Sequence, residues 1–237
     1  MAFRLIFALG LGLLLAGCRH HQIGGIQFRK ITHGRSDLRR YLHVHGNEAT
    51  ARDVLVEHMK SFRGSAYLVK SETRMAPLGA LRIDPNRMFS TVGARQNMHR
   101  FNRYASEAYV QNALDYLDRD RHRFLDKILP KPGGLLIVLH NNGAGYSVND
   151  ELEGSDAQSL PDAARPHEFM LTTQWGEFNA LKASPFNVVL QTAGEPDDGS
   201  LSRRCARMGV RYVNIEAGLG QYERQKEMLN WIEQNLP

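Results

Sequence analysis

The unbroken apolar run from Leu135 to Leu139 constrains the fold of this 237-residue chain most strongly. It follows the turn-forming segment Pro-Lys-Pro-Gly-Gly at 130–134 and has no polar position that could face solvent. A run of this kind is typical of a strand covered on both faces, as in the parallel sheets of α/β proteins. The sequence therefore predicts a central buried strand with helices on either side of it.

Helical and strand patterns alternate along the rest of the chain. Strands are predicted at 41–44, 66–69, 81–83, 169–171, 187–190 and 210–215, and helices at 51–62, 106–128, 174–183, 200–208 and 221–235. This order predicts a single α/β domain with a largely parallel mixed β-sheet and helices on both faces. In such sheets the functional residues lie in loops at the carboxyl ends of strands.

The N-terminus is typical of an export signal. Arg4 precedes an apolar run that ends in Leu15-Ala16-Gly17-Cys18, and these last residues resemble the bacterial lipobox. We therefore expect a signal peptide over 1–17, lipidation at Cys18, a tether over 18–36 and a folded domain over 37–237. The alternative is an ordinary signal peptide with an incidental cysteine.

An anchored chain of this kind would lie in the bacterial cell envelope, facing the periplasm, with a lipid anchor in the membrane. Arg19, rather than Asp, follows the cysteine, which by resemblance to enterobacterial lipoproteins favours the outer membrane. Lipidation of Cys18 would leave Cys205 as the one remaining cysteine, so no intramolecular disulfide is expected.

The charge pattern limits the classes of partner. The formal net charge of +5 is a mild excess that favours anionic surfaces such as lipid headgroups or cell-wall polymer. No dense basic and aromatic patch suggests nucleic acid, and export makes such a partner unexpected. The sequence does not determine the oligomeric state.

Three polar segments follow predicted strands. His45-Gly46-Asn47-Glu48 follows strand 41–44, His140 follows strand 135–139 and Glu216 follows strand 210–215. Two histidines and a glutamate are a ligand set for catalytic zinc, which keeps one position for water. A further carboxylate, here Glu216, could act as the general base.

Each of these residues also has an ordinary structural interpretation. A histidine at a strand end is usually a surface or structural residue. Glu48 could be a carboxylate favoured by the dipole at a helix N-terminus. Glu216 could pair with an arginine. The spacing alone does not decide between these interpretations and a zinc site.

The motifs also carry a family resemblance. His45-Gly46-Asn47-Glu48 resembles the first metal motif of zinc carboxypeptidases, especially of their succinylglutamate desuccinylase/aspartoacylase branch. Asp84-Pro85-Asn86-Arg87 resembles the Asp-x-Asn-Arg motif of that superfamily, and His140-Asn141-Asn142 is similar to its third-ligand segment. Glu216 lies where the family has its general base. The resemblance implies one Zn²⁺ ion held by His45, Glu48 and His140, with Glu216 as the base.

The resemblance also implies roles for residues around the metal. Asp84 would hydrogen-bond a metal-ligating histidine, which fixes its tautomer. Asn86 and Arg87 would hold a substrate carboxylate, for which the planar guanidinium is suited. The family polarises the scissile carbonyl with an upstream arginine. Arg74 in a predicted loop is favoured for this role over Arg82, which lies in a short strand.

Two features leave the substrate open. Tyr146 could line the substrate pocket or simply pack a loop. Many members of the desuccinylase branch have an aspartate two residues before the third ligand, where this chain has Val138. The chain also lacks an obvious appended β-domain of the aspartoacylase kind.

The sequence therefore predicts a membrane-anchored zinc hydrolase that cleaves an amide bond next to a free carboxylate. We expect a metallocarboxypeptidase acting on peptides, including cell-wall peptides. Amidohydrolysis of N-acyl amino acids is the enzymatic alternative. A metal-binding or ligand-binding lipoprotein without turnover is the non-enzymatic alternative.

Overall fold

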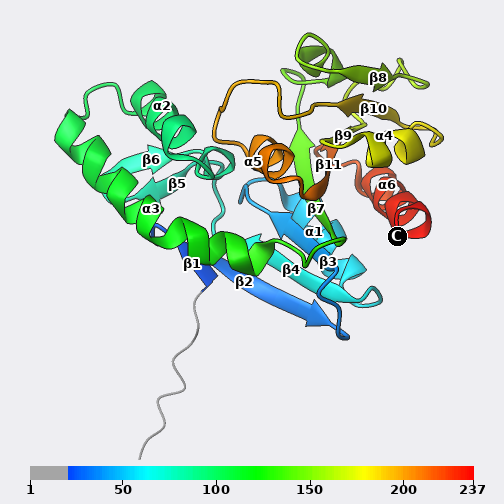
Figure 1. The fold of residues 1–237 in the computed structure, drawn as a ribbon, viewed down its shortest axis with the longest axis horizontal. Helices are drawn as coiled ribbons and strands as arrows, with labels where there is room; N and C mark the ends of the chain where they lie inside the picture. The colour runs from blue at the N-terminus through cyan, green and yellow to red at the C-terminus, as the bar shows by residue number, and fades with distance from the viewer. Residues whose placement is uncertain (1–20) are drawn as a thin grey trace, which may run out of the picture.

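A nine-stranded mixed sheet runs through the centre of the computed structural model, which describes residues 21–237 (Figure 1). The described residues form eleven strands, nine in this sheet and two in a separate hairpin. They are β1 (His21–Ile23), β2 (Ile26–His33), β3 (Arg39–His43), β4 (Gly64–Val69), β5 (Ala76–Leu78), β6 (Leu81–Ile83), β7 (Leu135–Asn142), β8 (Ala157–Ser159), β9 (Phe169–Thr172), β10 (Asn187–Leu190) and β11 (Arg211–Gly218). Their order in the large sheet is β1-β2-β4-β3-β7-β11-β9-β10-β8, and β5 pairs with β6 in a separate hairpin.

The centre of the sheet is parallel and its margins are mixed. Strands β4, β3, β7 and β11 pair in parallel, as do β9 and β10. The remaining pairs of the large sheet, β1–β2, β2–β4, β11–β9 and β10–β8, are antiparallel. The fold is thus the predicted single α/β domain with a largely parallel mixed sheet.

Within residues 21–237, six α-helices cover the two faces of the sheet. They are α1 (Ala49–His58), α2 (Thr91–Phe101), α3 (Glu107–Ile128), α4 (Trp175–Leu181), α5 (Leu201–Met208) and α6 (Tyr222–Asn235). Buried residues of α2, α3 and α5 form one hydrophobic core with one face of the sheet. Buried residues of α1, α4 and α6 form a second core with the opposite face.

Strand β7 shows why both faces must be covered. Leu136 and Val138 point into the first core, and Leu135, Ile137 and Leu139 point into the second. Because successive side chains of a strand point to opposite faces, an unbroken apolar run needs a cover on each side. The prediction of a central buried strand is confirmed, and all eight residues of β7 are buried.

The predicted tether over 18–36 is wrong for the part that the structure describes. Residues 21–33 form β1 and β2, which extend the sheet beyond β4. Ile23, Ile26 and Phe28 are buried in the first core. The polar residues that suggested a tether alternate with these apolar ones and face solvent. The expected signal peptide and the lipidation site Cys18 lie outside the described residues.

Most predicted helices and strands exist, with shifted ends. The predicted helix over 51–62 ends at His58, and the long helix follows its N-cap Ser106 as predicted. Helix α2 was not predicted, because its sequence is polar and contains Gly93. It is nevertheless capped by the Ser90 hydroxyl, which accepts a hydrogen bond from the Gly93 amide.

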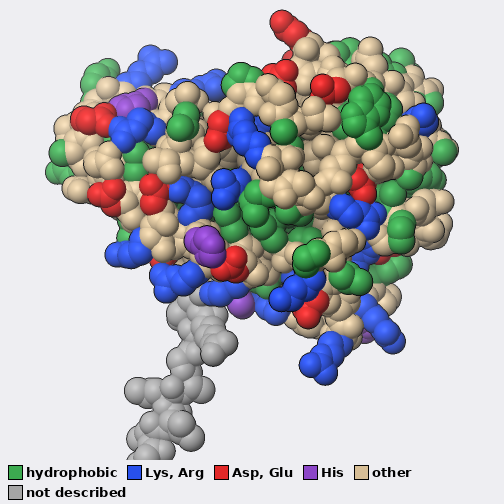
Figure 2. Space-filling view, viewed as in Figure 1, with side chains coloured by type: hydrophobic (Ala, Val, Ile, Leu, Met, Phe, Trp, Pro, Cys, Tyr) green, Lys and Arg blue, Asp and Glu red, His purple; other side chains and the backbone are tan. Residues whose placement is uncertain are grey.

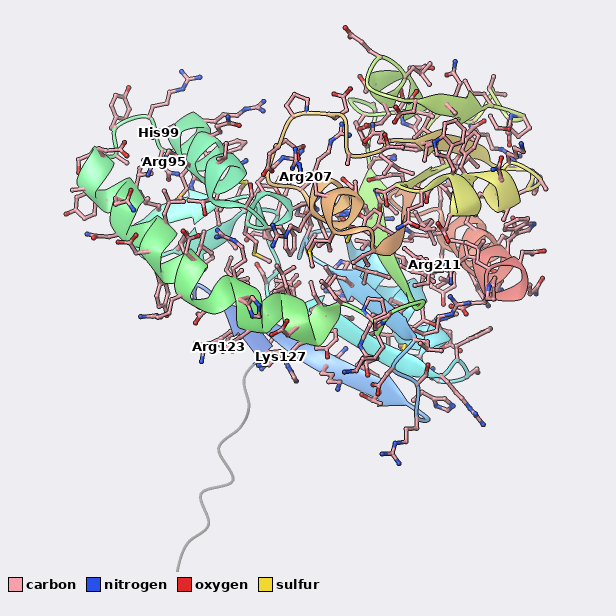
Figure 3. All side chains as sticks on the ribbon, viewed as in Figure 1. Arg95, His99, Arg123, Lys127, Arg207 and Arg211 are labelled. Atoms are coloured by element: carbon pink, nitrogen blue, oxygen red, sulfur yellow. The ribbon has the colours of Figure 1, made fainter. Side chains whose placement is uncertain are left out.

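The surface carries interspersed charges of both signs (Figure 2). Several cations labelled in Figure 3 have acidic partners, among them Arg123 with Asp120 at 2.9 Å and Arg211 with Glu177 at 2.6 Å. In the described part of the chain, no helix is both long enough and apolar enough to span a membrane.

Glu233 joins α6 to β3 and α1. Tyr41 donates a hydrogen bond of 2.7 Å to its carboxylate, and Arg39 and His58 each lie 3.3 Å from it. Burial tends to raise the pKa of Glu233, but these three partners outweigh it and lower the pKa below the ordinary 4.5. Because the pKa of Glu233 is lower in the folded chain than in the unfolded chain, its charged form stabilises the fold. This stabilisation is complete above the ordinary pKa of about 4.5 and is lost as the pH falls through the folded-state pKa.

Glu233→Gln is expected to lower the free energy of unfolding at pH 7 by about 1–3 kcal/mol, because a hydrogen-bonded charge is lost. The variant should also lose part of the pH dependence of stability below pH 4.5. Urea unfolding between pH 3 and pH 7 measures both effects. An identical acid slope in the variant would show that Glu233 does not contribute to acid unfolding.

Candidate metal centre

The candidate site lies at the carboxyl ends of the three central parallel strands β3, β7 and β11. His140 on β7 is paired in register with Glu216 on β11. His140 lies two positions after Val138, and Glu216 lies two positions after Asn214. Because side chains two positions apart on a strand point to the same face, His140 shares with Val138 the face that α2, α3 and α5 cover, and its partner Glu216 lies on that face too. Both residues lie within their strands and not after them as predicted, because the pairing of β7 with β11 continues to Asn142 and Gly218.

A tight turn after β3 brings His45 and Glu48 together. The Gly46 amide donates a hydrogen bond of 3.1 Å to the Thr73 carbonyl, which fixes the turn against the segment after β4. A Cβ atom at Gly46 would lie 2.1 Å from the Ser71 carbonyl oxygen, so only glycine fits this close approach. Glu48 immediately precedes α1, and its carboxylate does not cap that helix.

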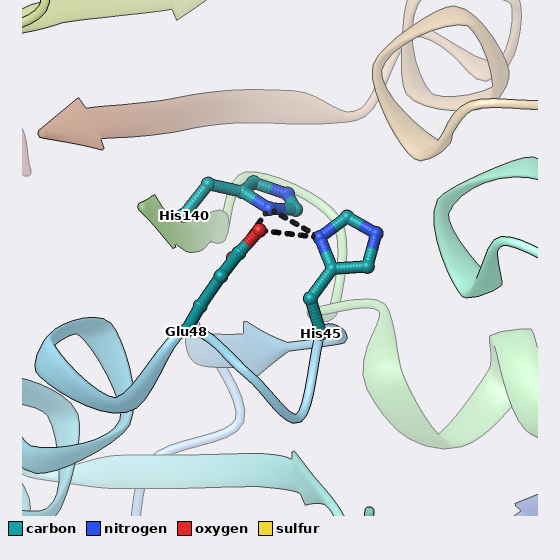
Figure 4. A group of neighbouring side chains, drawn as sticks. All are labelled: His45, Glu48 and His140. Atoms are coloured by element: carbon teal, nitrogen blue, oxygen red, sulfur yellow. Dashed lines mark hydrogen bonds and ion pairs between the residues drawn. The ribbon is translucent and has the colours of Figure 1, made fainter. Parts of the chain in front are cut away.

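His45, Glu48 and His140 converge on one point (Figure 4). The Nδ1 atom of His45 lies 2.7 Å from Oε1 of Glu48 and 3.1 Å from Nδ1 of His140. The Nδ1 atom of His140 lies 3.1 Å from Oε2 of Glu48. All three residues are buried. The structure thus brings the three predicted ligands into one cluster that could bind a metal ion.

The hydrogen bonds around His45 favour a positive charge at this point. Its Nε2 atom lies 2.6 Å from Oδ1 of Asp84, so this nitrogen carries a proton and donates to the carboxylate. In neutral imidazole Nδ1 then presents a lone pair, which faces both the carboxylate of Glu48 and the second imidazole. Lone pairs this close repel one another unless a cation or a proton lies between them. A metal ion with nitrogen and oxygen ligands satisfies the arrangement.

The pKa shifts also indicate that these surroundings favour a positive charge. Burial tends to lower the pKa of His45, but hydrogen bonds to Asp84 and Glu48 outweigh it and raise the pKa to about 9. Burial tends to raise the pKa of Glu48, yet His140 and His45 hold it well below its ordinary value. Burial also tends to raise the pKa of Asp84, but the hydrogen bond to His45 and the charge of His45 outweigh it and lower the pKa.

Asp84 holds His45 from the β6 side of the site. It precedes the 3-10 helix η1 (Pro85–Arg87) and accepts a 2.9 Å hydrogen bond from the Asn86 amide. Arg74 donates to both acids, at 3.0 Å to Glu48 and 3.4 Å to Asp84. The predicted contact between Asp84 and a histidine of the cluster is therefore present, and it fixes which nitrogen of His45 faces Glu48.

Glu216 is a buried carboxylate with neutral partners. Asn214 donates to its Oε1 at 3.0 Å and Asn142 to its Oε2 at 3.3 Å. Burial raises its pKa, the charge of Glu48 raises it further, and His140 opposes the shift. Among the described residues Glu216 forms no ion pair with an arginine. A buried carboxylate with a raised pKa beside a potential metal site is typical of a proton-transfer group.

The three ligands and Glu216 line a cavity of about 580 Å³. Arg74, Asn86, Arg87 and Tyr146 line the same cavity, together with Asn47, Glu151, Leu219 and residues 141–145. Arg82 does not line it; it lies on β6, where its backbone pairs with Asn102. Placement therefore favours Arg74 over Arg82 as an arginine that could reach a substrate.

The predicted carboxylate-binding residues have contacts of their own. The Asn86 side chain accepts a hydrogen bond of 3.3 Å from the Leu201 amide. Arg87 lies 3.6 Å from Asp198 and donates to the Asn86 carbonyl at 3.0 Å. These contacts hold both residues at the wall of the cavity, and Arg87 remains about one-third exposed.

The absence of a carboxylate at 138 has a visible consequence. Val138 is buried in the first core, and the Nε2 atom of His140 is buried with no hydrogen-bond partner in the described residues. The backbone carbonyl of His140 instead accepts a 2.8 Å hydrogen bond from Gln225 on α6. His140 is thus held through its backbone, whereas His45 is held through its ring.

Sequence reasoning missed four residues that shape the site: Asn142, Glu151, Asn214 and Gln225. The side-chain amides of Asn142 and Asn214 donate hydrogen bonds to the carboxylate of Glu216, and that of Gln225 donates to the backbone carbonyl of His140 on β7. The alternation of β11 places Asn214 on the face of Glu216, and this signal was available in the sequence. Glu151 ends a short 3-10 helix and belongs to no recognised motif, so only the structure places it in the cavity.

No protein family model matches the chain, and no curated protein matches it. Solved structures of candidate metallopeptidases from three Shewanella species are similar. The protein from S. denitrificans OS217 is 16% identical, with 90% of this chain and 80% of that chain covered and a TM-score of 0.43. The protein from S. amazonensis SB2B is 13% identical, with 90% and 86% covered and a TM-score of 0.44.

The third structure, from S. baltica OS155, is 13% identical, with 91% of this chain and 83% of that chain covered and a TM-score of 0.44. At these identities and TM-scores the similarity carries no argument about function. The functional assignment therefore rests on the side chains of the site.

Proposed function

We propose that this chain is a zinc-dependent hydrolase that cleaves an amide bond next to a free carboxylate, and specifically a metallocarboxypeptidase acting on peptides. The observation that supports it is the buried cluster of His45, Glu48 and His140 with Glu216 on the adjacent strand. A site that only stores metal needs no buried carboxylate of raised pKa beside its ligands.

The three candidate ligands, Glu216 and its two asparagine partners each have a role in this proposal. His45, Glu48 and His140 would hold the zinc ion, which supplies Lewis acidity that polarises a carbonyl and acidifies water. Glu216 takes a proton from the attacking water and later gives it to the leaving amine. Asn142 and Asn214 keep its carboxylate in place through their hydrogen bonds.

Two arginines would act on the substrate. Arg87, together with Asn86, binds the free carboxylate, because a guanidinium offers two parallel donors to it. Arg74 is half exposed and already donates to Glu48, so its remaining donors can reach the carbonyl oxygen that becomes negative during the reaction. This arrangement requires a substrate with a carboxylate close to the scissile bond.

A pair of peptides that differ only in a free or an amidated C-terminus tests the proposal. We expect the zinc-loaded chain to cleave the free acid and to leave the amide nearly intact. Arg87→Gln should lower kcat/KM for the free acid by about 10- to 100-fold, because a hydrogen bond to a charged group is lost.

Arg82→Gln is the matched control, since Arg82 lies outside the cavity, and it should leave kcat/KM unchanged. Equal cleavage of the acid and the amide by the wild-type chain would contradict the proposed substrate class.

The envelope location remains a prediction from residues 1–20. Mass spectrometry of the N-terminal peptide from membranes tests it: a diacylglycerol mass on Cys18 is expected, and an unmodified Cys18 would contradict the anchor.

A further inference from the structure

Glu151 is the third glutamate of the cavity and has no part in the proposed reaction. Glu48 belongs to the metal cluster and Glu216 is the proposed base, whereas Glu151 lies on the 3-10 helix η2 (Val148–Glu151). A capping box between Ser147 and Asp150 fixes the start of this short helix. The loop therefore presents the carboxylate of Glu151 to the cavity in a defined place.

The partners of Glu151 are neutral. The Tyr146 hydroxyl donates to Oε1, and the side-chain amide of Gln191 donates to Oε2. In the described part of the chain no Lys, Arg or His forms an ion pair with Glu151. A carboxylate offers about four lone-pair positions, so two neutral donors leave it able to accept from a cation.

Glu151 and the proposed carboxylate-binding residue Arg87 line the same cavity. Tyr146, whose hydroxyl donates to Glu151, also lines this cavity. Burial and the charges of Glu216 and Glu151 raise the pKa of Tyr146, and the charge of Arg87 opposes the shift. Tyr146 packs against Phe169, with ring centroids 5.8 Å apart, which keeps the phenol in position. Tyr146 thus shares the cavity with Glu216 and Arg87 and is hydrogen-bonded to Glu151.

We infer that Glu151 selects substrates whose terminal residue, the one with its carboxylate on Arg87, carries a positively charged side chain such as an ammonium or a guanidinium group. The inference rests on the proposed function and deepens it by naming the substrate class. A terminal residue with a carboxylate and a side-chain cation complements the lining of this cavity, since it offers the carboxylate to Arg87 and the cation to Glu151. A cation also replaces the water that would otherwise solvate the carboxylate.

Peptides ending in lysine, ornithine, norleucine or glutamate, in both stereochemical series, test the inference on the full zinc-loaded chain. We expect kcat/KM for lysine to exceed that for norleucine by about 10- to 100-fold, the size expected for one charge-assisted hydrogen bond. Glu151→Gln keeps the shape and one acceptor for Tyr146, and it should reduce this ratio to near one. Glu151→Lys should reverse the preference towards glutamate.

Glu153→Gln is the matched control, because Glu153 is an exposed glutamate two residues away that does not line the cavity. It should keep the lysine-to-norleucine ratio of the wild-type chain. A purely structural role of Glu151 would lower kcat/KM for lysine and norleucine peptides equally and keep the ratio, which would overturn the inference. Complete loss of turnover for every peptide in Glu151→Gln would also overturn it.

A binding measurement separates this inference from the proposed function. Calorimetry with benzoylglycyl-lysine and benzoylglycyl-norleucine on Glu216→Gln does not depend on turnover. Tighter binding of the lysine peptide that disappears in the double variant with Glu151→Gln supports the inference. If the wild-type chain cleaves no peptide, the proposed function fails and calorimetry alone decides the inference; equal affinities refute it.

Discussion

Glu216→Gln is expected to lower kcat by about 10²–10⁴-fold, the range typical for the loss of a general base. The amide cannot take a proton from water, but it has nearly the same shape and can still accept the hydrogen bond from Asn214. Because burial raises the pKa of Glu216, its charged form is costly in the folded protein. The variant should therefore unfold at the same temperature as the wild-type chain or above it.

Kinetics, zinc content and thermal unfolding of Glu216→Gln measure this prediction together. Glu177→Gln is a matched control, because Glu177 is also buried and pairs with Arg211 at the opposite end of β11. It should lose stability and keep full turnover. A Glu216→Gln variant that keeps zinc and hydrolyses at the wild-type rate would remove Glu216 from the mechanism.

His140→Ala is expected to weaken zinc binding on the order of 10³-fold. Zinc sites bind with about 10–16 kcal/mol spread over their ligands, so each ligand accounts for several kcal/mol. His140 supplies one of the three converging atoms, and among the described residues its ring forms no hydrogen bond outside the cluster. Purified His140→Ala should contain less than stoichiometric zinc and show no hydrolysis.

Asp84→Asn should weaken zinc binding less than His140→Ala does, because Asp84 is hydrogen-bonded to His45 and is not one of the candidate ligands. Loss of such an outer contact costs about 10- to 100-fold in metal affinity. His58→Gln is the control for a buried histidine outside the cavity and should keep its zinc. Competition with a chromogenic chelator measures all four proteins. Equal zinc affinity in the wild-type chain and His140→Ala would exclude His140 as a ligand.

The fold could largely be predicted from local sequence patterns. The apolar run 135–139 and the alternation around it identified the central strand β7 and the α/β class. Strands β5 and β8 were missed, as were β1, β2 and α2, and these last three are rich in polar residues. Their stability comes from contacts distant in sequence, such as the pairing of β2 with β4. A local pattern does not contain that information.

The candidate site could be predicted in part. The residues of the cluster were identified from their motifs, because ligand chemistry restricts the residue types to a few, His and Glu among them. Their strand-end placement was only approximate: His140 and Glu216 lie inside β7 and β11, since the length of a strand depends on its neighbours. The choice between Arg74 and Arg82 depended on which loop faces the cavity, and only the structure shows this.

The sequence by itself determined the fold class and the residues able to bind a metal, because periodicity and side-chain chemistry are local properties. Only the tertiary structure decided that His45, Glu48 and His140 meet within hydrogen-bonding distance, although 95 positions separate the two histidines. It also decided that Glu151 shares their cavity. Parallel pairing of β3, β7 and β11 brings these distant segments to one edge of the sheet, and a linear chain carries no local record of that pairing.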